Sequence, residues 1–205
     1  LSPKFLVGES YGTTRAAGLS GYLQGRHGLF LNGIMLVSAI LDFSTVDFTP
    51  GHDLPYVVHL PTQAATAWYH GALEGERPLA DVLAEAETFA DGEYAAALHL
   101  GARLDDSRQG EVARTYARLC GLDVDFILRS DLRVTLARFR KELLRGRGLT
   151  VGRLDSRFTG LDRDHAGAEP SDDASMTAIL GPYAAAMNHL VPVSYTHLTL
   201  PTSDL

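Results

Sequence analysis

The chain has 205 residues, which is enough for one domain of ordinary size and too few for two well-packed cores. Hydrophobic residues make up 45% and charged residues 21%, a balance that excludes disordered, collagen-like and coiled-coil proteins. The formal net charge of −7 offers no basic surface for phosphates, so we expect no nucleic-acid partner, and no apolar run approaches the length of a membrane span.

The first part of the chain has the pattern of a strand, a sharp turn, a helix and a second strand. A short apolar run ends at Gly8, and apolar residues at helical spacing follow it. The next stretch, 31–43, is almost continuously apolar, which is typical of a central parallel strand covered on both faces. We therefore expect strands at 4–8 and 31–41, running parallel, with a helix that begins near Thr13 between them.

The composition changes after Asp42, where prolines become frequent, and apolar residues then recur with a period near 3.6 as far as about Leu144. The helices that this pattern predicts are Thr62–Leu73, Leu79–Leu100, Gln109–Leu119 and Asp131–Leu144. Residues 155–175 are polar and rich in aspartate, which favours a loop. The whole stretch predicts a mainly helical layer that packs separately from the strands.

Two runs of like charge lie within this helical stretch. Acidic residues are concentrated in 74–93 and basic residues in 129–153. We interpret these runs as solvated helix faces of opposite sign, able to face one another, and not as an anion site.

The motif with the clearest chemical meaning is Gly8-Glu9-Ser10-Tyr11-Gly12, which fits the pattern G-x-S-x-G. In a nucleophile elbow this pattern forms a tight turn between a strand and a helix, and small neighbours avoid collisions there. The helix N-terminus and the backbone N–H of Tyr11 would then stabilise a developing oxyanion. The alternative is an ordinary connection between a strand and a helix, but the predicted context is the one that the mechanism needs.

The same region resembles the nucleophile region of the serine carboxypeptidases, in their bacterial branch. The resemblance rests on residues 8–13 with 15–19, and it continues through 31–34, 64–70 and 151–160, so that it covers residues 1 to about 191. It implies an α/β-hydrolase fold, present here as a partial sheet with the nucleophile βαβ unit, and a largely helical insertion that caps the active site.

The resemblance also implies roles for three residues. Ser10 would be the nucleophile that forms an acyl-enzyme, and the Tyr11 N–H would be an oxyanion donor. Glu9 would bind the terminal carboxylate of a peptide substrate, which requires a protonated carboxyl group and favours acid pH. The alternative role of Glu9 is to cap the helix N-terminus. Rival functions are an aminopeptidase or esterase with the same elbow, and a non-catalytic binding protein of the same fold.

The sequence implies no cofactor and no metal, since it has no CxxC, no HExxH and no close histidine pair with a carboxylate. The single cysteine, Cys120, ends an amphipathic helix and is expected to be a buried apolar residue.

A histidine base and an acid are needed to activate the serine, in the chain order Ser, Asp, His. By pattern alone, Asp172 or Asp173 could be paired with His189, but the strands that should present them are missing. The resemblance places both groups further along than residue 191. We therefore expect this chain by itself to be inactive.

The two ends of the chain suggest an internal fragment. Leu1-Ser2-Pro3 has no initiator methionine and no signal core, so the sequence indicates no compartment, although the family is usually exported. The end, 193–205, resembles the translation of a transposase adapter used in sequencing libraries, and we expect it to be non-native; the alternative is a genuine β-rich tail. The expected segments are a core fragment at 1–45, a helical cap at 46–176, the start of a return to the core at 177–192, and the tail.

Overall fold

A computed structural model describes residues 2–194 of the chain. The fold is mixed helix and strand, 58% helical, with two small sheets, which confirms the α/β character at this coarse level. The chain divides into two compact units, Leu1–Pro55 and Tyr56–Leu205, and each is described by itself below.

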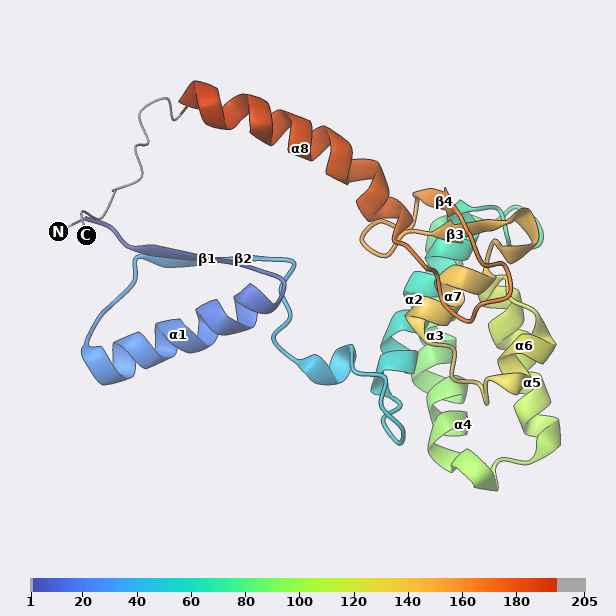
Figure 1. Ribbon diagram of the computed structural model, residues 1–205. Coiled ribbons are helices and arrows are strands. Elements are labelled where there is room, and N and C mark those ends of the chain that lie inside the picture. The colour runs from blue at the N-terminus through green and yellow to red at the C-terminus, as the bar shows by residue number, and fades with distance from the viewer. Residues whose placement is uncertain (1, 195–205) are drawn as a thin grey trace. The chain divides into compact units, whose positions relative to one another are not determined.

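The first unit is a strand-helix-strand arrangement. Strand β1 (Phe5–Glu9) is followed directly by helix α1 (Tyr11–His27) and then by strand β2 (Gly33–Val37) (Figure 1). The two strands are parallel, in a register that pairs Phe5 with Gly33 and Glu9 with Val37. The predicted parallel pair is thus confirmed, but β2 is shorter than expected, because Ser38 leaves the extended conformation with a φ of +52°.

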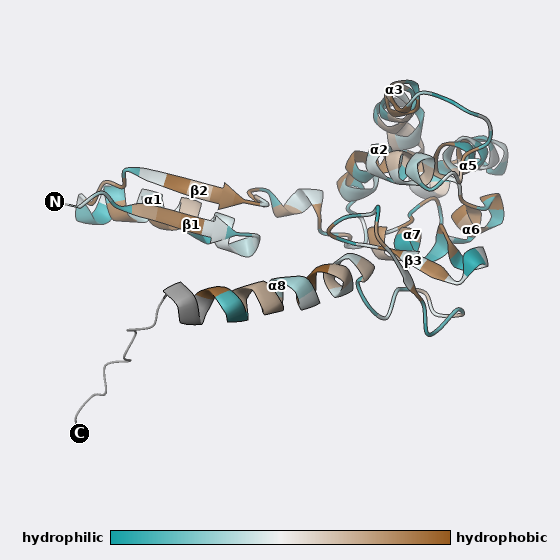
Figure 2. Ribbon diagram, turned by 90° about the horizontal axis from the view of Figure 1, so that it is seen from above, coloured by the Kyte–Doolittle hydropathy of each residue, from teal (hydrophilic) through white to brown (hydrophobic). Residues whose placement is uncertain are grey.

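The expectation that the strands are buried on both faces is wrong. On one face of β1, Leu6 is half-buried and Gly8 is buried. On the opposite face, Phe5 and Val7 are 57% and 65% exposed. Figure 2 shows hydrophobic residues along both strands. The reason is the small number of layers, since α1 packs on the sheet and covers only one face of it. The uncovered apolar face predicts low solubility of this unit.

The second unit is mostly helical. Its helices are α2 (Leu54–Tyr69), α3 (Leu79–Phe89), α4 (Ala95–Leu100), α5 (Asp106–Cys120), α6 (Val124–Arg129), α7 (Leu136–Glu142) and α8 (Ala174–Ser194). A π-helical turn, Ala90–Tyr94, joins α3 to α4, so the predicted helical run from 79 to 100 is continuous. The core consists of side chains that are fully enclosed, among them Leu60, Val82, Val112, Tyr116 and Ile127.

Helix α2 begins earlier than predicted. Because proline is unfavourable inside a helix, we predicted that the helix starts after Pro61. In the structure it begins at Leu54 and continues through Pro61. Leu60 and Ala64, on either side of the proline, are completely buried. Their burial offsets the local cost of about 3 kcal/mol that an interior proline carries.

The helix predicted over 131–144 is wrong in its first part. Asp131 and Leu132 both have a positive φ, of +51° and +60°, which ends α6 and delays α7 until Leu136. The carbonyl of Leu132 accepts a hydrogen bond from the buried Tyr94 hydroxyl at 2.8 Å. A tertiary partner therefore turns the backbone at a place where the apolar spacing would allow a helix to continue.

Two short strands and a turn follow α7. Strands β3 (Leu149–Val151) and β4 (Thr159–Leu161) are antiparallel, so the expected loop at 155–175 contains a strand. In the turn between them, hydrogen bonds from Arg157 lower the pKa of Asp155 to about 2. The turn is also attached to the helices, because the carbonyl of Ser156 lies 2.6 Å from Nε2 of His70.

Helix α8 spans the segment expected to return to the core. Its exposed side chains include Leu180, Tyr183 and Met187. The helix ends at Ser194, so the first two residues of the expected non-native tail are helical, and 195–205 lie outside the described residues. Within residues 2–194, no helix is long and apolar enough to span a bilayer.

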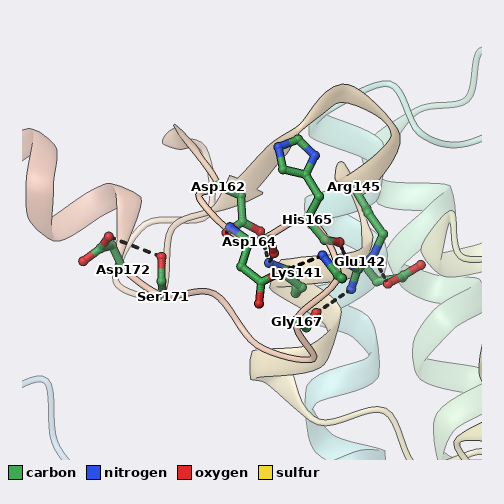
Figure 3. Close-up of polar contacts among 10 residues, drawn as sticks. Lys141, Glu142, Arg145, Asp162, Asp164, His165, Gly167, Ser171 and Asp172 are labelled. Atoms are coloured by element: carbon green, nitrogen blue, oxygen red, sulfur yellow. Dashed lines mark hydrogen bonds and ion pairs between the residues drawn. The ribbon is translucent and has the colours of Figure 1, made fainter.

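The two charged runs have other partners than we expected. In the acidic run, Glu85 pairs with Arg77 at 2.8 Å and with Arg118 at 2.5 Å. In the basic run, Lys141 pairs with Asp162, which lies in the aspartate-rich stretch after β4 (Figure 3). The aspartate-rich stretch therefore neutralises part of the basic helix α7.

Candidate active site

Ser10 occupies the turn between β1 and α1, where an elbow would place it. Its backbone has a φ of +53° and a ψ of −123°, a region that residues with a side chain rarely adopt. Such strained residues persist only where the surroundings impose them, and they are concentrated at functional sites. The side chain is partly exposed, and its hydroxyl has no hydrogen-bond partner among the described residues.

Only one of the two glycines of the motif is required by close packing. A Cβ atom at Gly8 would lie 2.2 Å from the carbonyl oxygen of Gly12 and 2.7 Å from the nitrogen of Thr13. A Cβ atom at Gly12 would meet nothing within 4 Å. The expectation that small residues prevent collisions is confirmed for Gly8 and wrong for Gly12.

This asymmetry predicts different effects of alanine at the two glycines. Gly8→Ala should lower the free energy of unfolding by at least about 2 kcal/mol, because the methyl group would collide with backbone atoms that cannot move aside. Gly12→Ala is the matched control and should be neutral or stabilising by about 0.5–1 kcal/mol, because alanine favours the first turn of α1. Urea unfolding followed by far-UV dichroism measures both. Equal effects would contradict the steric explanation.

Backbone and side-chain hydrogen bonds surround the turn. The Ser10 N–H donates to the carbonyl of Val37 at 3.0 Å, which joins the turn to the end of β2. The Ser10 carbonyl accepts from the Thr13 N–H at 2.9 Å and from the Thr13 hydroxyl at 2.7 Å. Thr13 has no feature in the sequence that distinguishes it from any other threonine near a helix start, so sequence reasoning missed it.

Tyr11 and Glu9 flank the serine on its two sides. Tyr11 is the first residue of α1, and an N–H in that position has no acceptor within the helix, so it remains able to bind an oxyanion. Tyr11 is 59% exposed, and the centroid of its ring lies 6.0 Å from that of the Phe43 ring. Glu9 ends β1 and is exposed. Its carboxylate has no hydrogen bond among the described residues, so it does not cap α1 through a hydrogen bond, and its charge at the helix N-terminus stays the alternative role.

Within the first unit, neither described histidine is hydrogen-bonded to Ser10. In the first unit, His27 is the last residue of α1 and therefore lies about 25 Å along the helix from Ser10, at about 1.5 Å per residue. His52 has Nε2 at 2.6 Å from the carbonyl of Ser44, and its charge contributes to the lowered pKa of Asp42, after the larger effect of hydrogen bonds from Ser44. The other described histidines, His59, His70, His99, His165 and His189, belong to the second unit. His197 lies outside the described residues.

The pairing of Asp172 or Asp173 with His189 is wrong. Helix α8 begins directly after Asp173, so its carboxylate and His189 are separated by about 24 Å of helix axis. The Asp173 carboxylate already accepts the Arg153 N–H at 2.8 Å and the Ser175 hydroxyl at 2.7 Å. Burial opposes ionisation of Asp173, but these hydrogen bonds outweigh it and lower its pKa. The carboxylate therefore holds the start of α8.

Other nucleophile and metal chemistry finds no support in the described part of the chain. The Cys120 side chain is completely buried, as expected, and burial raises the pKa of its thiol, which keeps it protonated. No group of three or more histidine, cysteine, aspartate or glutamate side chains within residues 2–194 is arranged to hold a metal ion. No family model matches the chain, and no curated protein or solved structure matches it significantly.

Proposed function

We propose that this chain carries the nucleophile elbow of an α/β-hydrolase of the serine carboxypeptidase type, with a partial sheet in its first 55 residues and a mainly helical insertion after it. The observation that carries the proposal is the backbone of Ser10. It combines a strained positive φ, a place at the carboxyl end of a parallel strand and the N-terminus of a 17-residue helix.

The proposed reaction is acyl transfer to Ser10. The hydroxyl oxygen attacks the carbonyl of the last peptide bond and gives its proton to a base, and the tetrahedral oxyanion accepts a hydrogen bond from the Tyr11 N–H. The C–N bond then breaks, and the terminal amino acid leaves with a proton from the same base. Water hydrolyses the acyl-enzyme and regenerates the serine.

The proposed substrate is a peptide with a free C-terminus. Glu9 is adjacent to the nucleophile and has an unengaged carboxyl group, so it can bind the substrate carboxylate when it is protonated. The elbow by itself also suits an esterase or an aminopeptidase, and Glu9 favours the carboxypeptidase over these rivals. The role of Glu9 therefore separates the carboxypeptidase from its rivals.

The test uses the protein that is expressed from the genomic locus of this sequence. We expect it to release the C-terminal residue from a blocked dipeptide faster at pH 4.5 than at pH 7, and not to act on the corresponding dipeptide amide. Ser10→Ala should abolish release. Glu9→Gln should retain activity with reduced dependence on pH, because an amide donates a hydrogen bond at every pH. Equal cleavage of acid and amide would contradict the carboxypeptidase assignment and favour another hydrolase.

A further inference from the structure

Two serines with unusual backbone conformations lie at the ends of neighbouring strands. The register pairs Glu9 with Val37, so the next residues, Ser10 and Ser38, are opposite each other as the chain leaves the sheet. Both have a positive φ, of +53° and +52°. In parallel sheets ligands bind beyond the carboxyl ends of the strands, so both serines lie where a substrate would be expected.

A single buried side chain connects the two segments. Thr13 has no exposed surface, and its hydroxyl both donates to the Ser10 carbonyl at 2.7 Å and accepts from the Ile40 N–H at 3.0 Å. The neighbouring Thr14 hydroxyl donates to the Ile40 carbonyl, but it makes no hydrogen bond to Ser10. Thr13 is thus the one of these two threonines whose side chain links the elbow to the segment after β2.

This arrangement explains how the strained turn is retained. A residue at φ +53° returns to an ordinary conformation unless its peptide groups are held, and Ser10 is held through its N–H by Val37 and through its carbonyl by Thr13. Removal of the Thr13 hydroxyl would leave the Ser10 carbonyl with the Thr13 N–H, at 2.9 Å, as its remaining donor, and would leave the Ile40 N–H without its acceptor.

We propose that Thr13 is a positioning residue for Ser10, which holds the nucleophile in its strained conformation and fixes the Ser38–Ile40 segment beside it. This inference rests on the proposed role of Ser10 as the nucleophile. Thr13 touches no reacting atom and acts only through the backbone of Ser10 and Ile40.

The test is nuclear magnetic resonance of the full chain labelled with [15N]serine and kept at micromolar concentration. A positive φ brings the amide hydrogen close to the α hydrogen of the same residue and gives a strong Overhauser effect between them. We expect this signal for Ser10 and for Ser38, because both have a positive φ. Thr13→Val keeps the shape but removes the hydroxyl, and it should lose the signal of Ser10. Thr13→Ser keeps the hydroxyl and should retain it.

Thr14→Val is the matched control, because it loses a contact to Ile40 without touching Ser10, and it should retain the signal. Retention of the Ser10 signal in Thr13→Val would overturn the proposal, as would an equal loss in Thr14→Val. If Thr13→Val fails to fold, Thr13→Ser provides the test. Loss of the Ser10 signal in Thr13→Ser would show that the methyl group of Thr13, and not its hydroxyl, holds the turn. The readout is conformational, so inactivity in the peptidase test would contradict the proposed function, whereas the Overhauser effect separately tests whether Thr13 holds the Ser10 backbone.

Discussion

The chain of 205 residues is expected to show no turnover as a serine hydrolase, although Ser10 is present in the turn between β1 and α1. The Ser10 hydroxyl has no hydrogen-bond partner within its own unit, residues 2–55, so no base of that unit lowers its affinity for its proton. In a triad enzyme, loss of the histidine or the serine alone costs on the order of a million-fold in kcat. Release of the terminal residue from a blocked dipeptide at pH 4.5 and pH 7, with fluorophosphonate labelling in parallel, measures this.

Turnover that disappears in Ser10→Ala would contradict this expectation and would show that a base exists within the chain. The first residue to test would then be His52, which belongs to the same unit as Ser10 and lies near Asp42. His27→Ala is the matched control, because His27 is at the far end of α1 and cannot reach the serine.

A second large effect is expected from the buried ion pair of Lys141 and Asp162. Their side chains are 0% and 5% exposed, and the Lys141 ammonium also donates to the Asp164 carbonyl (Figure 3). Lys141→Met should lower the free energy of unfolding by about 3 kcal/mol, because it leaves a carboxylate enclosed without its partner. Burial opposes ionisation of Asp162, but the hydrogen bond and charge of Lys141 outweigh it and lower its pKa.

The double variant Lys141→Met with Asp162→Leu should recover most of that loss, since two apolar side chains need no partner. Arg157→Met is the control. The pair of Arg157 with Asp155 is exposed, so this substitution should leave the unfolding midpoint unchanged.

The effect of Lys141→Met should also depend on pH. Because folding lowers the pKa of Asp162, its ion pair stabilises the folded protein at pH values above the unfolded pKa of about 3.9. This stabilisation is lost as the pH falls through the folded-state pKa. Urea midpoints at pH 7 and pH 3 measure both effects, and a double variant no better than Lys141→Met would contradict the account.

The sequence by itself determined the local features of this protein. Gly8 before Ser10, with an apolar run on one side and helical spacing on the other, was enough to predict the strand, turn and helix of the elbow. The parallel partner strand followed from an almost continuous apolar run, and the long helical run over 79–100 followed from periodicity. These features are short in range, because a turn, a strand or a helix depends mainly on residues within a few positions of it.

Only the tertiary structure decided features that depend on contacts between distant residues. The Tyr94 hydroxyl binds the Leu132 carbonyl where the backbone turns, and a helix that periodicity allowed is interrupted there. Lys141 pairs with Asp162, 21 residues away, in a stretch that the sequence predicted to be a loop. At the candidate site, Thr13 joins Ser10 to Ile40, which lies 27 positions after Thr13. Such partners depend on which side chains folding brings together, and each buried polar group must be satisfied there, so the spacing of neighbours along the chain does not reveal them.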